Sequence, residues 1–287
     1  MPEKVFMKNL SKTPIKPEKK DRTQAWQIIL IALFLFYMLL PIFSTYVFSI
    51  ATRWDRTILP EGYTFEYYGE ATDASYFVSS LRNSMILSVS TILVSLVLII
   101  PTVYWVFIRL PQARSFLDVL MILPFGIPTV VLALALVQVY NGTFIGRSPE
   151  LLIGAVFIYS MPFMYRPIVN AMRSVDALTL TEAGQSLGAT TLQVLLKVII
   201  PNIYPGIISG SLLVFATVFA EFTLTKLILG ARFKTFPLLL VEYTRINGNI
   251  AAAFSVISFS IAWLASILIL WVGKKGQGSS AHTPHAH

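Results

Sequence analysis

Long apolar runs constrain this chain more than any other feature of its sequence. There are six runs of roughly 20 mainly apolar residues, the length that a helix needs to cross a bilayer. Peptide groups find no partner in the lipid, so such a segment must satisfy its backbone internally. The runs therefore predict an all-α integral membrane protein with six transmembrane helices. They cover residues 26–50, 85–108, 116–140, 151–169, 204–229 and 254–272.

Composition agrees with this class and excludes several chemistries. Only 13% of the 287 residues are charged, against about 25% in soluble domains. The chain has no cysteine, so it can form neither a disulfide nor a thiolate site. Its three histidines, His282, His285 and His287, all lie at the C-terminal end. We therefore expect no catalytic residue and no metal site within the membrane.

Lysine and arginine counts predict the orientation, because cytoplasmic flanks carry an excess of both. Six spans place both termini on one side, and that side receives 14 of the 22 basic residues. We therefore expect cytoplasmic termini, and most of the +8 net charge is then a topological signal rather than a nucleic-acid surface. The expected parts are a basic cytoplasmic tail at 1–25, a transmembrane domain at 26–273 and a disordered cytoplasmic tail at 274–287.

Two segments on the opposite side are sizeable, residues 51–84 and 230–253. The first is aromatic and rich in turn-forming residues. Each is either a plain connection or a surface that receives an external partner.

A polar, patterned segment separates the fourth and fifth apolar runs. Thr179 and Glu182 fit a capping box at a helix start, and Thr190 with Gln193 offers a second one. Gly188 between them suits the left-handed residue that ends a helix. Pro201 disfavours helix at the preceding residue and marks the next boundary. The segment is thus predicted to be a hairpin of two amphipathic helices, which either packs on its own protein or docks on another.

The exact residues of this hairpin resemble the cytoplasmic signature of binding-protein-dependent ABC importer permeases. That signature is E-A-A, three residues, G, nine residues and I-x-L-P. Here Glu182-Ala183-Gly184 is followed by Gly188 and then, nine residues later, by Val198-Ile199-Ile200-Pro201. Every spacing matches, and the three departures are small or aliphatic exchanges. Asp176, six residues before Glu182, also suits the family.

The resemblance implies a coupling segment at about 176–201 that docks into a cytoplasmic ATPase subunit. The implied docking residues are Asp176, Glu182, Ala183, Gly184, Gly188 and Ala189. Two ATPase subunits, an extracytoplasmic substrate-binding protein and a second permease subunit, expected to be a related chain, are the implied partners besides the lipid bilayer. The chain lacks the G-x-x-x-x-G-K-[ST] phosphate loop. ATP and Mg²⁺ are therefore expected on the partner ATPase, with no cofactor on this chain.

Glu221 and several prolines interrupt the apolar runs. An ionisable residue inside a span usually faces protein or water rather than lipid. Glu221 is thus a candidate for the substrate pathway, for pairing with a second permease, or for a snorkelling arrangement beside Lys226. The break Leu123-Pro124-Phe125-Gly126-Ile127-Pro128 belongs either to such a pathway or to a purely structural kink. Gly206 and Gly210 form the G-x-x-x-G pattern of close helix packing.

Substrate is less constrained by the sequence than the class of protein. The outer segments look most like permeases for polyamines, aminophosphonates and related small charged nutrients. Permeases for inorganic anions, ferric iron or sugars are the alternatives within the family. An ATP-independent channel or carrier would not need the hairpin, and an intramembrane enzyme would need a catalytic group that the sequence lacks.

Overall fold

The computed structural model describes residues 22–54 and 57–278, and these residues are helical throughout most of their length. Within them, the sole β pairing is an isolated bridge between Ala51 and Tyr63. The predicted all-α class is therefore confirmed. The elements are α2 (Arg22–Ile50), α3 (Glu66–Asp73), α4 (Phe77–Arg109), η1 (Pro111–Ala113), α5 (Arg114–Ile122), η2 (Leu123–Gly126), α6 (Thr129–Val139), α7 (Pro149–Ser174), α8 (Ala177–Ser186), α9 (Thr191–Val194), η3 (Leu195–Ile199), α10 (Ile200–Asn202), α11 (Tyr204–Phe219), α12 (Thr223–Ile228), η4 (Gly230–Phe233), α13 (Phe236–Tyr243) and α14 (Gly248–Gly278).

The chain divides into two units between Val47 and Phe48. Most of α2 belongs to the first unit, and its residues Trp26–Ile50 have a mean hydropathy of 2.5. The predicted tails lie largely outside the described residues, as do all three histidines. The boundaries expected for the tails remain predictions.

Four helices, α2, α4, α7 and α14, are long and apolar enough to cross a membrane unbroken. Two bent pairs bring the number of candidate spans to as many as six. In the first pair, residues Pro111–Gly126 meet α6 at 95°. Pro124 and Pro128 flank this bend, where proline supplies no N–H for a continuing helix. The third predicted span is therefore broken rather than straight.

The fifth predicted span also differs from a single helix. α11 ends at Phe219, and α12 begins only at Thr223. On its other side, residues Thr191–Asn202 meet α11 at 73°. The predicted helix boundary at Pro201 was wrong by a few residues, because the helical run Thr191–Asn202 continues through Pro201 after the π-helical turn Leu195–Ile199. The direction changes at Ile203 instead.

The core of the second unit is a bundle in which α11 packs on α7 and on α4. Tyr104, Met164 and Ile168 are among its largest fully buried side chains. Gly206 and Gly210 let α11 approach α7 closely. A Cβ on Gly206 would lie 2.5 Å from the Ala171 Cβ, and one on Gly210 would lie 2.6 Å from the Met164 Sδ. The predicted packing role of this glycine pair is thus confirmed.

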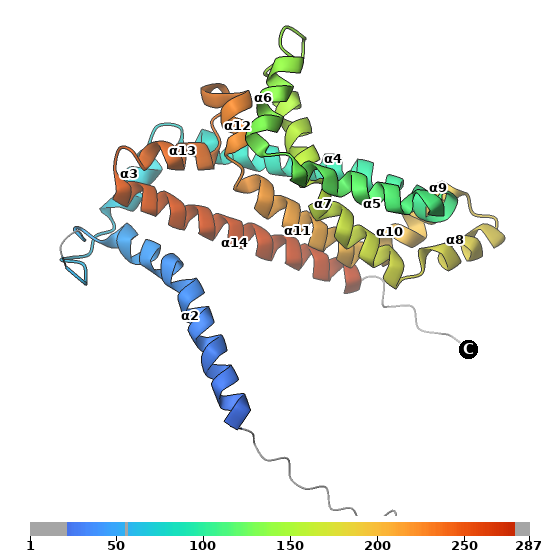
Figure 1. Cartoon of the computed structure of the whole chain (residues 1–287), viewed down its shortest axis with the longest axis horizontal. Coiled ribbons are helices and arrows are strands. Elements are labelled where there is room, and N and C mark those ends of the chain that lie inside the picture. Colours follow the sequence, from blue (N-terminus) through green and yellow to red (C-terminus); the bar gives the residue numbers. More distant parts are fainter. Residues whose placement is uncertain (1–21, 55–56, 279–287) are drawn as a thin grey trace, which may run out of the picture. The chain divides into compact units, whose positions relative to one another are not determined.

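The two outer segments of the sequence pack against each other at one end of the bundle. Phe236 and Phe254 are fully buried there, and the Phe77 ring contacts both, with centroids 5.8 and 6.0 Å away. The Ser84 hydroxyl accepts a hydrogen bond from the Phe236 amide at 2.8 Å. Figure 1 shows α3 and α13 at this end and the α8–α9 hairpin at the other.

Candidate functional site

The hairpin between α7 and α11 begins at an aspartate rather than at the predicted threonine. Asp176 has φ +47°, and its carboxylate accepts a hydrogen bond of 2.7 Å from the Thr179 hydroxyl and a longer one from the Thr179 amide. The capping box predicted at Thr179 and Glu182 was therefore wrong. Helix α8 starts at Ala177, because the Asp176 carboxylate is available one turn earlier to satisfy a free amide of the first turn.

The turn of the hairpin is closed by glycine, as predicted. Gly188 has φ +83°, a conformation that glycine adopts without strain. The Ala189 amide donates to the Gly184 carbonyl at 3.1 Å, and the Gly188 amide donates to the Gln185 carbonyl at 2.9 Å. These two bonds form the Schellman motif that satisfies the last carbonyls of a helix. The two helices of the hairpin are therefore joined by a defined turn.

The second helix starts with the predicted capping box. The Gln193 amide donates to the Thr190 hydroxyl at 3.3 Å, and the Thr190 amide donates to the Gln193 side chain at 2.8 Å. After one turn, α9 passes into a π-helical turn at Leu195–Ile199. Such turns are rare and often occur at functional sites.

Gly184 stands where the family signature has its second alanine, and the fold explains the exchange. A Cβ on Gly184 would lie 2.8 Å from Cγ2 of Val194, a fully buried residue of α9. The two helices are packed too closely at this point for an alanine methyl group without a shift of the valine. Gly184 therefore serves the packing of the hairpin on itself.

The hairpin is fastened to the bundle through a pair that the sequence did not single out. Thr181, fully buried, lies 3.2 Å from the Tyr104 hydroxyl, which comes from α4. Thr181 also donates to the Ala177 carbonyl at 2.7 Å. Tyr104 is itself 2% exposed. The one sign of this contact in the sequence is that a tyrosine inside an apolar run needs a hydrogen-bond partner for its hydroxyl.

The opposite face of the hairpin is open. Glu182, Ala183 and Gly188 are exposed, and Leu187 at the tip is 89% exposed. Leu192 and Leu196 on the second helix are 62% and 54% exposed. Among the residues whose side chains are described, 26–54 and 57–271, the Glu182 carboxylate forms no ion pair. The hairpin thus presents leucines around one carboxylate.

Glu221 occupies the break between α11 and α12. Its two carboxylate oxygens accept hydrogen bonds from the Leu224 amide at 2.6 Å and the Thr225 amide at 3.0 Å. The Thr225 hydroxyl donates a third bond at 2.9 Å. Glu221 is 7% exposed. It therefore satisfies the free amides at the start of α12, a role that was not predicted, while its place on a substrate pathway remains a prediction.

Replacing Glu221 with glutamine should destabilise this corner. A glutamine offers one acceptor oxygen where three donors converge, and its amide would face donors with its own N–H₂ group. Leaving buried donors without a partner costs about 1–3 kcal/mol. We expect a lower melting temperature for the purified protein, measured by thermal unfolding in detergent. An unchanged melting temperature together with reduced uptake would instead favour contact with the solute.

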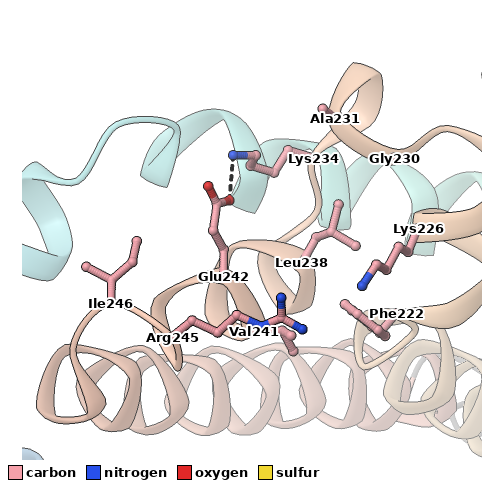
Figure 2. Close-up of a pocket in the computed structure, with 10 residues that line it drawn as sticks. All are labelled: Phe222, Lys226, Gly230, Ala231, Lys234, Leu238, Val241, Glu242, Arg245 and Ile246. Atoms are coloured by element: carbon pink, nitrogen blue, oxygen red, sulfur yellow. Dashed lines mark hydrogen bonds and ion pairs between the residues drawn. The ribbon is translucent and has the colours of Figure 1, made fainter.

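A cleft of ≈ 560 Å³ lies between α12 and α13 at the end opposite the hairpin. Figure 2 shows Lys226, Lys234 and Arg245 around it with Glu242. Lys234 pairs with Glu242 at 2.7 Å, and Lys226 lies 5.0 Å from the Phe222 ring centroid. Lys226 thus contacts the Phe222 ring. Among the described side chains, Lys226 forms no ion pair with Glu221, beside which a snorkelling arrangement was one of the predicted alternatives. No group of three or more metal-ligating side chains occurs in the described part of the chain.

Comparison with known proteins decides the family. The model of the binding-protein-dependent transport system inner membrane component matches residues 107–275, which include the whole hairpin. The chain belongs to this family. It is a multi-pass inner membrane permease of an ABC importer, and ATP hydrolysis takes place on a partner ATPase. The predicted class of protein is confirmed, as is the assignment of the chain to transport rather than catalysis.

Relatives within this permease family carry several cargoes. The chain is 29% identical to the spermidine/putrescine transport system permease protein PotB of Escherichia coli (strain K12), covering 84% of this chain and 92% of that one. It is 32% identical to the sulfate transport system permease protein CysT of Salmonella typhimurium, covering 55% and 61%. A crystal structure of a bacterial ABC transporter involved in the import of the acidic polysaccharide alginate superposes with a TM-score of 0.67 at 20% identity, covering 92% and 99%. That likeness shows the fold.

Proposed function

We propose that this permease forms half of the translocation path for a small charged nutrient, polyamine-like or aminophosphonate-like, that an extracytoplasmic binding protein delivers. Its hairpin at 176–201 docks into the ATPase and transmits the motion of ATP binding to the bundle. A second permease, a related chain, supplies the other half of the path. Both termini and the hairpin lie in the cytoplasm.

The exposed tip of the hairpin carries the docking proposal. Leu187 at 89% exposure, beside a left-handed Gly188, is a large apolar side chain on a segment otherwise rich in polar residues. Burial of such a side chain against a partner stabilises by about 1.5–3 kcal/mol. The turn, the cap at Thr190 and the close packing of Gly184 on Val194 make the hairpin stiff, and the Tyr104–Thr181 contact links it to α4. A stiff, fastened segment is what mechanical coupling requires.

The charge pattern supports the proposed orientation. Arg109, Arg166, Arg173 and Lys197 all lie at or toward the hairpin end of α4, α7 and the following segment. Cytoplasmic flanks are enriched in such residues. The opposite end, with its cleft between α12 and α13, then faces outward and is our candidate for contact with the binding protein.

Similarity to the polyamine permease over most of both chains supports a small charged cargo. The sulfate relative, at 32% identity over 171 residues, supports an inorganic anion as the second candidate. Because an external binding protein selects the solute in this family, the ligand of that protein best distinguishes the two candidate cargoes.

Affinity purification of the tagged permease from its own membrane is expected to retain an ATPase subunit and a second permease. Mass spectrometry identifies them, and the binding protein that associates with the complex is then tested for ligands by calorimetry with spermidine, 2-aminoethylphosphonate and sulfate. Binding of sulfate alone would move the conclusion to the anion candidate. Uptake that persists after deletion of the ATPase would contradict the docking proposal.

A further inference from the structure

A polar face lies in the C-terminal third of α7, toward the hairpin end. Arg166, Asn170 and Arg173 follow one another at spacings of four and three residues, so they share one side of the helix. All three are exposed in the chain, although the 26-residue helix has a mean hydropathy of 1.4 over its most apolar window. This face points away from the core of its own subunit.

The same face borders a pocket of ≈ 290 Å³ between α5 and α7. Asp118 enters it from α5, and the Tyr165 hydroxyl donates to the Asp118 Oδ1 at 2.6 Å. Among the described residues, Asp118 forms no ion pair with either arginine, so its second oxygen is open to the pocket. The pocket therefore contains one carboxylate, two guanidinium groups and one amide.

Arg166 lies near the hairpin end of the predicted span 151–169, and Asn170 and Arg173 follow just after that span. Arginine has a long stem that can carry its charge to the membrane surface, but asparagine has no such stem. Ionisable residues within spans usually face protein or a water-filled cavity. The core of the chain lies on the other side of α7, so this polar face is not covered by the chain itself.

We propose that Asp118, Arg166, Asn170 and Arg173 form a solute-binding site on the translocation path, which takes a phosphonate or phosphate group whose carrier also bears an amine. This inference rests on the proposed transport function. Guanidinium groups recognise phosphate-type oxyanions through paired hydrogen bonds. The open oxygen of Asp118 suits an ammonium group. A polyamine carries only positive charge, so it would be repelled by the two arginines and attracted by only the one carboxylate.

Glu221, the other acidic candidate, is less suited to bind a solute. Both of its oxygens are occupied by the first turn of α12, whereas Asp118 has an oxygen free of internal bonds. Farther along the same side of α7, the Phe125 ring from η2 packs on Tyr159 and Phe163, with centroids 6.4 and 5.4 Å away. These three rings lie beside the polar site, on the side farther from the C-terminal end of α7.

The chain contains no cysteine, which allows a direct test by single-cysteine labelling. Asn170→Cys is introduced into the full transporter complex in phosphatidylcholine nanodiscs without nucleotide. Its rate of reaction is measured with two small thiosulfonates, one anionic and one cationic. A cleft with an excess of positive charge concentrates anions, and roughly tenfold faster labelling by the anionic reagent is expected. The preference should be lost, and should turn toward the cationic reagent, when Arg166 and Arg173 are both changed to glutamine, because the Asp118 carboxylate remains.

Two control positions calibrate the rates. Gln112→Cys lies in the exposed η1 turn and should react readily with less charge preference, whereas Val97→Cys, on an exposed apolar face of α4, should not react. Ile122→Cys provides a second position in the pocket if Asn170→Cys assembles poorly, because Ile122 lines the same pocket, is 40% exposed and carries no charge. Failure of both pocket cysteines to react in an assembled complex would overturn the proposal, as would faster labelling by the cationic reagent.

Ligand protection separates a transported solute from a lipid headgroup, since both present the same oxyanion. Slower labelling in the presence of millimolar 2-aminoethylphosphonate, with no effect of spermidine, supports a solute site. Protection that appears only when phosphatidylglycerol replaces part of the phosphatidylcholine would assign the pocket to lipid and overturn the proposal. Labelling does not depend on ATP hydrolysis, so failure of ATPase docking and failure of this site are distinguishable.

Discussion

Replacing Gly188 with tryptophan should reduce ATP-driven uptake by at least about tenfold, equivalent to roughly 1.4 kcal/mol, while membrane insertion stays intact. The left-handed conformation at φ +83° costs a non-glycine residue about 1–2 kcal/mol. Apart from its chain neighbours, no atom of the described residues lies within 4 Å of the position that a Cβ would occupy, so the indole would have open space. It would stand beside Leu187, on the face that we assign to the ATPase.

Two matched variants separate the causes. Gly188→Ala carries the backbone cost without the bulk, so it should retain more uptake than the tryptophan variant. Gly142→Trp places the same side chain at another glycine with φ +80° and open space, outside the hairpin. It should transport normally if the hairpin is the docking site.

Uptake into cells or proteoliposomes and ATPase activity are measured on the same preparations. We expect the tryptophan variant to lose the ATPase stimulation that the loaded binding protein produces. Glu182→Lys, a charge reversal at an exposed position of α8, should also reduce this stimulation of the ATPase. Normal coupling in both variants, with the ATPase retained in the complex, would contradict the docking assignment.

Replacing Gly206 with leucine should disrupt the bundle itself. A Cβ at this position already lies 2.5 Å from the Ala171 Cβ and 2.7 Å from the Pro167 carbonyl oxygen. Both neighbours belong to α7, which cannot yield locally because it packs on α4 as well. Overpacking of this kind costs about 1–3 kcal/mol or more, and we expect a lower melting temperature and little assembled complex.

Gly154→Leu is the matched control for that variant. Gly154 is also a glycine within a membrane helix, but no atom lies within 4 Å of its added Cβ. Its melting temperature in detergent should stay close to that of the parent protein. Equal behaviour of the two leucine variants would mean that the close contact of α11 with α7 does not limit stability.

The sequence by itself determined the helical membrane class, the glycine turn of the hairpin and the family. Each of these depends on local properties: run length against bilayer thickness, the conformational freedom of Gly188, and the spacing from Glu182 to Pro201. The capping box at Thr190 was predictable for the same reason, since both of its partners lie within four residues.

Tertiary structure decided what depends on contacts between distant residues. The buried contact of Tyr104 with Thr181 joins positions 77 residues apart, and no local pattern specifies it. Helix α8 starts at Ala177 rather than after Thr179, because the fold uses Asp176 as the N-cap directly after α7 ends. Glu221 became a cap because α11 stops just before it. The polar pocket at Asp118 likewise depends on the packing of α5 alongside α7, which brings the Asp118 carboxylate near two arginines of α7.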